Sequence, residues 1–552
     1  MATKFQEKHS NGLDDHDIDG DDDDDEFRYL IVRPEKGGLR DLVQYAVLRD
    51  TGSGVRFLES SDEQVSDSVA EAQRWVIVVS VIARKILALI GNPLKWTGYL
   101  VDFILNLLSL NGNLSGLLSN LVHGKVLVPQ RGTETFISTI GQLDGRIELY
   151  QKRESLAEHI VASVNSEETS MKEELGNRAV MDLCIMASKL AYENAKVVRE
   201  IVVDHWKMHF VDFYDCWNDF QKQMSTQVFI LCDKPKDANF ILVSFRGTEP
   251  FDADDWSTDF DYSWYEIPEL GKVHMGFLEA LGLGSRTNVV TFYNQIVLYN
   301  QLQEKHKLIP QNGVKVSKGP SEGIKALSSN AAAGNKVVPP DMVEKSAYYA
   351  VRKKLDSLLE EHKNAKVVVT GHSLGGALAI LFPCVLVLHE EMELMDRLLG
   401  VYTFGQPRVG NRQLGRYMES HLNKPIRKYF RVVYSNDLVP RLPYDDRTFL
   451  YKHFGVCLYY DSLYNEHITK EEPNRNLLGL RFLIPLYLNA AWELIRSLTM
   501  GYTYGPEYQE GWFSILLRMI GLVLPGLSAH SPTNYVNSVR LGMERIVQIS
   551  SF

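Results

Sequence analysis

The sequence predicts an α/β protein with a mainly parallel central sheet that is covered by helices on both faces. Three short apolar runs with strand character, residues 366–370, 399–404 and 428–435, are separated by stretches long enough for helical crossovers. The first run leads directly into a glycine-rich turn at 371–376, and residues with helical spacing follow at once. A strand, a tight turn and a helix in immediate succession indicate where the sheet would place reactive residues.

The first 70 residues are acidic, and we expect them to be largely disordered. Residues 15–26 match the calcium-loop pattern D-x-D-x-D-G-x5-E, but Pro34 follows soon after, and Asp22 stands where such loops carry an apolar residue. A solvated acidic tract is therefore the expected structure, and calcium binding stays open. The segment 1–8 lacks the apolar core of a signal peptide, so we expect a protein that is not secreted.

Charge and cysteine content narrow the class of protein. A net charge of −11 over 552 residues argues against a nucleic-acid partner. Five cysteines are scattered without a C-x-x-C pair, which fits reduced core thiols better than a disulfide framework or a zinc site. The sequence contains no cluster of metal-binding residues outside the acidic tract. It does not indicate the oligomeric state of the protein.

An apolar region, residues 71–125, separates the acidic segment from a catalytic domain at 126–552. Arg84 and Lys85 interrupt its apolar runs and Pro93 predicts a bend, so no stretch of about 20 residues is apolar enough to predict a spanning helix. Two shorter helices could lie in a lipid interface with their apolar face down, or could pack as core helices. The pattern favours neither arrangement.

The catalytic domain is expected to begin with a helix at 181–192, followed by a β-hairpin formed by 227–232 and 240–245. Residues 309–341 are dominated by Gly, Ser, Ala, Lys and Pro, which predicts a disordered surface insertion. Helical spacing returns at 346–359, directly before the first strand named above.

Ser373, at the centre of Gly371-His-Ser-Leu-Gly375, is the candidate nucleophile. The flanking glycines relieve crowding around a serine that is held in a strained turn. Because a serine hydroxyl is a poor nucleophile at neutral pH, it needs a histidine base, an acid that orients the histidine, and donors for the oxyanion. After a turn of this type the expected chain order is Ser, then Asp or Glu, then His.

Asp437 is the candidate acid, because it lies where the strand at 428–435 stops and prolines prevent its continuation. His530 is the candidate base, since it lies in a loop just before Ser531-Pro532 opens the last helix. The rival acids are Asp445, Asp446 and Asp461, and the rival bases are His453 and His467. His453 stands in a segment that alternates like a strand, where a packing role or a structural hydrogen bond is expected.

The expected oxyanion donors are the backbone N–H of Leu374 and that of Thr248, at the end of the second hairpin strand. Gly247 would let the backbone approach the substrate there. The segment 251–264 interleaves acids with large aromatics. It predicts either a lid that buries its aromatics over the site or a surface helix with a core stripe.

These motifs resemble the class 3 lipases of the α/β-hydrolase fold. The motifs that occur in the order of that family are Phe245-Arg-Gly-Thr248, Val273-His-Met-Gly-Phe277, Gly371-His-Ser-Leu-Gly375, Thr403-Phe-Gly-Gln-Pro-Arg-Val-Gly410 and Asn436-Asp-Leu-Val-Pro-Arg441. The resemblance implies a triad of Ser373, Asp437 and His530, an oxyanion hole at Thr248 and Leu374, and chemistry without a cofactor.

Small secreted class 3 lipases lack the region at 71–125, the insertion at 309–341 and an apolar cap insertion at 474–528. The arrangement of these three additional regions around the catalytic domain is similar to that of the plant oil-body lipases, which hydrolyse triacylglycerol at lipid droplets. The resemblance thus implies a triacylglycerol substrate and a peripheral or monotopic place on the cytosolic face of a lipid droplet. Ala529 stands before the base, where some relatives place an acid.

Two alternatives remain at this point. One is a phospholipase A1 or galactolipase of the same superfamily, although the acidic N-terminus does not fit a chloroplast transit peptide. The other is a non-catalytic lipase-like signalling protein. Such proteins typically lose a triad residue or the glycines of the turn, and this chain retains them.

Overall fold

The computed structural model describes residues 28–61, 63–150, 178–268, 270–297, 345–424, 426–444, 450–474 and 480–544. The acidic tract at 15–26, the insertion at 309–341 and the rival acids Asp445 and Asp446 lie outside these residues.

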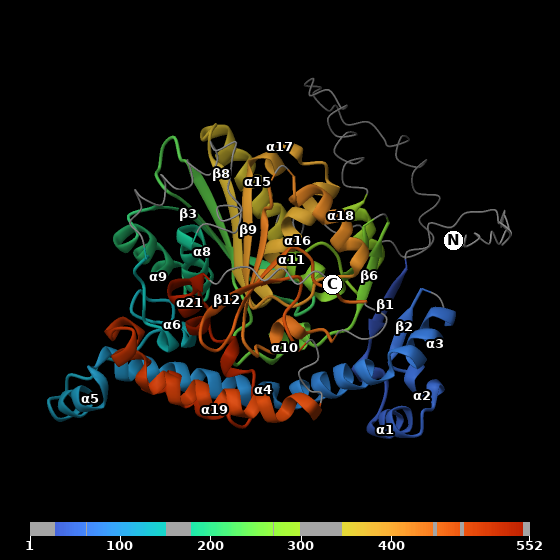
Figure 1. The fold of residues 1–552 in the computed structure, drawn as a ribbon, viewed down its shortest axis with the longest axis horizontal. Helices are drawn as coiled ribbons and strands as arrows, with labels where there is room; N and C mark the ends of the chain where they lie inside the picture. The colour runs from blue at the N-terminus through green and yellow to red at the C-terminus, as the bar shows by residue number, and fades with distance from the viewer. Residues whose placement is uncertain are drawn as a thin grey trace, which may run out of the picture.

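A nine-stranded sheet forms the centre of the described chain, in the order β13-β12-β11-β10-β9-β8-β5-β4-β3 (Figure 1). Its strands are β3 His209–Asn218, β4 Gln223–Cys232, β5 Phe240–Phe245, β8 Lys366–His372, β9 Leu398–Phe404, β10 Tyr429–Tyr434, β11 Val456–Tyr460, β12 Asn465–Thr469 and β13 Met543–Glu544. The run from β5 through β8, β9 and β10 to β11 is parallel, whereas β3 and β4 extend it as an antiparallel hairpin edge. The hairpin predicted from residues 227–232 and 240–245 is the antiparallel pair β4 and β5, and the predicted parallel centre is also present.

Helices cover both faces of this sheet, and each face has its own apolar core. On one side lie α8 Arg178–Leu190, α9 Ala195–Glu200 with the π-helical turn Ile201–His205, and α21 Pro532–Leu541. On the other side lie α11 Met275–Leu281, α12 Val290–Ile296, α15 Ala347–Glu361, α16 Leu374–Leu388, α17 Met392–Arg397 and α18 Arg412–Leu422. Because the central strands are buried on both faces, they read as unbroken apolar runs such as Val-Val-Val in β8.

The segment from residue 28 onward is ordered, so the predicted disorder of 1–70 is wrong for this part. Its elements are β1 Tyr29–Val32, α1 Leu39–Val47, α2 Thr51–Val55, β2 Leu58–Ser60 and α3 Glu63–Ala72. β1 pairs with β2 and also with β6 Trp264–Ile267, which in turn pairs with β7 Gly271–His274. The apolar strand β1 is stabilised by a partner more than 200 residues away, and the acidic composition of its neighbours gives no sign of that pairing.

The apolar region forms one continuous helix, α4 Arg74–Leu110, followed by α5 Asn113–Val122 and α6 Thr139–Leu143. The expected division into two shorter helices at Pro93 is therefore wrong. A proline costs the helix a hydrogen bond, but α4 packs along the lid segment (residues 251–264), which supports the helix on both sides of the proline. The expectation that no stretch here is apolar enough for a spanning helix is not met, because α4 is long and apolar enough to cross a membrane by length and composition.

The cap insertion contributes α19 Leu480–Thr503 and α20 Trp512–Gly521. In Figure 1, α4 and α19 both run along the lower edge of the molecule, with α10 Ala253–Asp259 of the lid segment just above them. α4 packs against α10, and α19 packs against α20.

Candidate active site

Ser373 stands at the turn between β8 and α16, with φ 60° and ψ −132°. Such a left-handed conformation is strained for a residue with a side chain, and it is the geometry expected of a nucleophile elbow. The glycines around it are sterically required: a Cβ on Gly371 would lie 2.2 Å from the carbonyl carbon of Gly375, and one on Gly375 would lie 2.3 Å from the carbonyl oxygen of Phe245.

The structure brings Ser373, His530 and Asp437 into one hydrogen-bonded chain. His530 Nε2 lies 2.8 Å from Ser373 Oγ, and His530 Nδ1 lies 2.8 Å from Asp437 Oδ2. Asp437 follows β10, as predicted, and His530 ends a short 3-10 turn at Ser528–His530 just before α21. With Nδ1–H donating to the carboxylate, Nε2 is free of its proton and accepts the serine hydroxyl hydrogen.

Asp437 is fully buried and its carboxylate has further donors. The backbone N–H of Val439 donates to Oδ1 at 2.9 Å, and the hydroxyl of Tyr535 donates to Oδ2. These two donors fix the orientation of the carboxylate toward His530. Gly405 allows this close assembly, because a Cβ there would lie 2.9 Å from the His530 ring and 3.0 Å from Asp437.

A second histidine, His372, holds the backbone of the candidate base. Its Nε2 donates to the carbonyl oxygen of His530 at 3.0 Å, and its Nδ1 accepts from the hydroxyl of Tyr192 at 2.9 Å. Burial, together with the neighbouring His530, lowers the pKa of His372 well below its ordinary value, so the ring stays neutral and keeps this donor and acceptor arrangement.

The predicted oxyanion residues flank the nucleophile. A Cβ on Gly247 would lie 3.0 Å from the Cβ of Ser373, so the backbone that leads into Thr248 passes directly beside the serine. Leu374 is the first residue of α16, where backbone N–H groups have no partner within the helix. Thr248 is also fixed from the lid segment, because its hydroxyl donates to Asp259 Oδ2 at 3.0 Å.

The lid segment closes the site. Ser373 has no exposed surface, His530 is only 8% exposed, and the ring of Trp256 lies 6.4 Å from the ring of His530, centroid to centroid. The face of α10 turned inward carries Asp255 and Asp259, whereas the aromatic Trp256 is half-buried. The expected burial of the aromatics is therefore only partly right: the closed lid also buries two carboxyl groups.

Burial raises the pKa of both of these lid carboxyls. The pKa of Asp259 rises to about 8, and that of Asp255 rises to about 7 with a further contribution from the charge of Asp252. Asp255 nevertheless accepts from the backbone N–H of Glu249 at 2.8 Å, so it ties α10 to the strand end that carries Thr248.

The described rival residues lie apart from the site. His453 donates from Nε2 to the carbonyl oxygen of Pro440 at 2.7 Å, which is the structural hydrogen bond expected of it. Asp461 follows β11 and His467 lies on β12, and these two side chains lie 3.6 Å from each other. Within the described ranges, no group of three His, Cys, Asp or Glu residues is placed to hold a metal ion.

Four supporting residues were not anticipated from the sequence: Tyr192, His372, Asn534 and Tyr535. Asn534 donates from Nδ2 to the carbonyl oxygens of Ser528 and Ala529, which supplies the loop support that Ala529 itself cannot give. The spacing of Asn534 and Tyr535 after His530, on the first turn of a helix that begins with Pro532, was the available signal.

The fold and this geometry place the protein among the serine hydrolases with an α/β-hydrolase fold. More narrowly, the chain belongs to the class 3 lipase family. The family model described as Lipase (class 3) matches residues 242–447. The triacylglycerol lipase OBL1 of Nicotiana tabacum is 60% identical over 95% of this chain and 96% of its own, and that of Arabidopsis thaliana is 57% identical over the same shares.

Among solved structures, the Rhizomucor miehei lipase propeptide complex aligns at 18% identity with a TM-score of 0.32, covering 53% of this chain and 70% of that one. The predicted α/β-hydrolase fold and the predicted membership in the class 3 lipases are both confirmed.

Proposed function

We propose that the protein hydrolyses the acyl esters of triacylglycerol through an acyl-enzyme on Ser373. The observation that carries this proposal is the hydrogen-bonded chain from Ser373 Oγ through His530 to Asp437. The relatives at 60% and 57% identity that are named triacylglycerol lipases support the substrate.

In the first half of the reaction, Ser373 Oγ attacks the ester carbonyl carbon while His530 Nε2 takes the hydroxyl proton. The backbone N–H groups of Thr248 and Leu374 stabilise the oxyanion that forms. Asp437 keeps the Nδ1–H tautomer of His530 and stabilises the imidazolium. Collapse of the intermediate breaks the ester bond, and His530 returns the proton to the departing diacylglycerol alkoxide.

In the second half, water attacks the acyl-enzyme and gives its proton to His530. The second tetrahedral intermediate releases a fatty acid, and Ser373 Oγ regains its proton. Because Ser373 is fully covered in the closed structure, the lid segment must move before a lipid ester can reach it.

We further infer that the enzyme works on the neutral-lipid monolayer of a lipid droplet, at its cytosolic face. α19 supports this inference because its polarity is inverted: Ile484, Leu488, Ile495 and Leu498 are exposed, whereas Glu493 and Arg496 are buried. The buried pair is held by Tyr434, which donates to Glu493 at 3.2 Å and accepts from Arg496 at 2.8 Å. A helix that binds the protein through its charges presents its apolar stripe to an apolar environment.

α4 and α20 extend this apolar surface. On α4, Leu89 and Trp96 are 80% and 72% exposed, and on α20 Trp512 is 58% exposed. α4 is best placed in the plane of the monolayer, although its length would allow it to span a bilayer. Arg84 and Lys85, in its first third, donate to the carbonyl oxygens of Val32 and Gly37. An orientation that carries this part of the helix across a bilayer would break these bonds and place two cations in hydrocarbon.

The test is a substrate panel of tri-, di- and monoacylglycerols, phospholipids and galactolipids with wild type and Ser373→Ala. We expect release of fatty acid from emulsified triolein by wild type and a loss of at least about 10³-fold in Ser373→Ala. Hydrolysis of phospholipid or galactolipid in preference to triolein would reject the proposed substrate. Activity retained in the variant would reject the nucleophile.

A further inference from the structure

The apolar helix α4 holds the lid segment at both of its ends. At one end, Ser80 Oγ donates to the carbonyl oxygen of Phe260 at 2.7 Å, and Arg84 Nη1 donates to Asp261 Oδ1 at 2.9 Å. At the other end the helix comes so close that a Cβ on Gly98 would lie 2.6 Å from the Cβ of Phe251. The surface proposed to meet lipid and the segment that covers Ser373 are thus directly joined.

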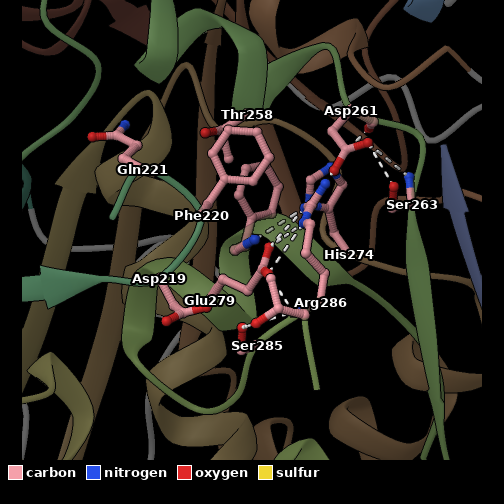
Figure 2. Close-up of polar contacts among 12 residues, drawn as sticks. Asp219, Phe220, Gln221, Thr258, Asp261, Ser263, His274, Glu279, Ser285 and Arg286 are labelled. Carbon is pink, nitrogen blue, oxygen red and sulfur yellow. Dashed lines mark hydrogen bonds and ion pairs between the residues drawn. The ribbon is translucent and has the colours of Figure 1, made fainter. Parts of the chain in front are cut away.

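Asp261 belongs to the polar cluster in Figure 2, in which Arg286 lies between Asp261 and Glu279. Arg286 donates to its Oδ2 at 2.7 Å, Ser263 Oγ donates to its Oδ1 at 2.7 Å, and His274 Nε2 donates to its carbonyl oxygen at 2.9 Å. Although burial alone would raise the pKa of Asp261, the guanidinium groups of Arg286 and Arg84 hold it well below its ordinary value. The carboxylate is charged and anchors the end of the lid segment.

Arg286 belongs to the body of the enzyme, since it is also bound by the buried Glu279 of α11 through Nη2 at 2.7 Å. Arg84 belongs to the apolar helix. Asp261 therefore has one cationic partner on each side of the boundary between the catalytic core and the lipid-facing helix. Loss of Arg84 leaves the carboxylate paired with Arg286, so the core can keep its fold.

The anchored end lies next to the oxyanion residue. Asp259, two residues before Asp261, accepts the hydroxyl of Thr248, and Arg84 Nε also donates to Ser257 Oγ at 3.3 Å within α10. Arg84 therefore connects α4 to residues 257–261, which lie beside Trp256 over His530 and are bonded to Thr248 near Ser373.

We propose that Arg84 is a positioning residue that holds the lid segment closed and couples its opening to the seating of α4 on lipid. This role rests on the proposed lipase function. In solution the bonds from Arg84 and Ser80 keep residues 257–261 on α4. When the exposed face of α4 enters a monolayer, the helix shifts, these bonds break, and the lid segment is free to leave the active site.

The test compares Arg84→Gln with Lys85→Gln in the full-length protein. Both variants lose one cation from neighbouring positions of α4, but Lys85 donates to Gly37 in the N-terminal segment and not to the lid segment. The substrates are a short-chain ester kept below its solubility limit and emulsified triolein. For Arg84→Gln we expect about a tenfold higher rate on the dissolved ester with little change on triolein, because the closed lid loses charge-assisted hydrogen bonds.

Lys85→Gln should stay within about twofold of wild type on both substrates, and Arg84→Lys should fall between wild type and Arg84→Gln. General damage to the fold would lower both rates and cannot raise the rate on the dissolved ester. Ser80→Ala, which removes only the bond to Phe260, gives a milder second test with the same direction of change.

An unchanged ratio of the two rates in both Arg84→Gln and Ser80→Ala would overturn the proposal while leaving the lipase function intact. If wild type left triolein untouched, the function would fail separately. The coupling would then be measured by amide hydrogen exchange over residues 251–262, which needs no substrate. Faster exchange in Arg84→Gln but not in Lys85→Gln supports the role of Arg84, and equal exchange rejects it.

Discussion

Replacing the exposed stripe of α19 with glutamine tests the lipid-facing surface most directly. The variant combines Ile484→Gln, Leu488→Gln, Ile495→Gln and Leu498→Gln. Glutamine keeps the helix propensity, and the buried pair Glu493 and Arg496 that docks the helix is untouched.

The size of the effect follows from exposure. The four side chains are 73%, 67%, 57% and 58% exposed. Full burial of a leucine or isoleucine contributes about 1.5–3 kcal/mol, so the exposed part of each contributes at least about 1 kcal/mol on entering lipid. Four such side chains amount to about 4 kcal/mol, which is about three orders of magnitude in the partition coefficient. Because α4 and α20 still contact the lipid, we expect a fall of at least about 100-fold.

The assay is flotation of labelled protein with triolein droplets that carry a phospholipid monolayer. Met392→Ser is the control, since Met392 is 51% exposed on α17, at the opposite edge of the molecule from α4 and α19 (Figure 1). The rate on a dissolved ester should stay at the wild-type value, which separates lost binding from lost catalysis. A partition coefficient within threefold of wild type, with the control unchanged, would refute the assignment of α19 to the lipid surface.

Two further predictions concern the active site. Tyr535→Phe removes the hydroxyl that donates to the buried Asp437, so the free energy of unfolding in urea should fall by about 1.5–3 kcal/mol; a change below about 0.5 kcal/mol would mean that Tyr535 does not stabilise this carboxylate. Asp259 has a pKa raised to about 8, so the closed fold holds a proton that the unfolded chain releases near pH 4, and stability is lost as pH rises from about 4 to about 8. Asp259→Asn should reduce the loss of unfolding free energy between pH 5 and 8 by about 2–4 kcal/mol, as measured by thermal unfolding, while the contribution of Asp255 remains. An unaltered dependence of stability on pH would contradict a protonated Asp259.

The sequence by itself determined the local elements and the order of the site residues. The valines of β8, the glycines around Ser373 and the helical spacing after them are short-range patterns, and each corresponds to a strand, a turn or a helix in the structure. Asp437 was placed correctly after β10 because a strand end and its prolines are also local signals. The roles of Asp437, His530 and the oxyanion residues, like the domain boundaries, stay predictions.

Tertiary structure decided which distant residues meet and which face of each helix is buried. Ser373 and His530 are 157 residues apart in the chain, and no periodicity reports that they touch. β1 pairs with β6, and α4, which runs through Pro93, packs on the lid segment; no local pattern reports either contact. The amphipathic pattern of α19 does not reveal which face turns outward. Its charged residues Glu493 and Arg496 are buried against Tyr434, and its apolar face is left exposed.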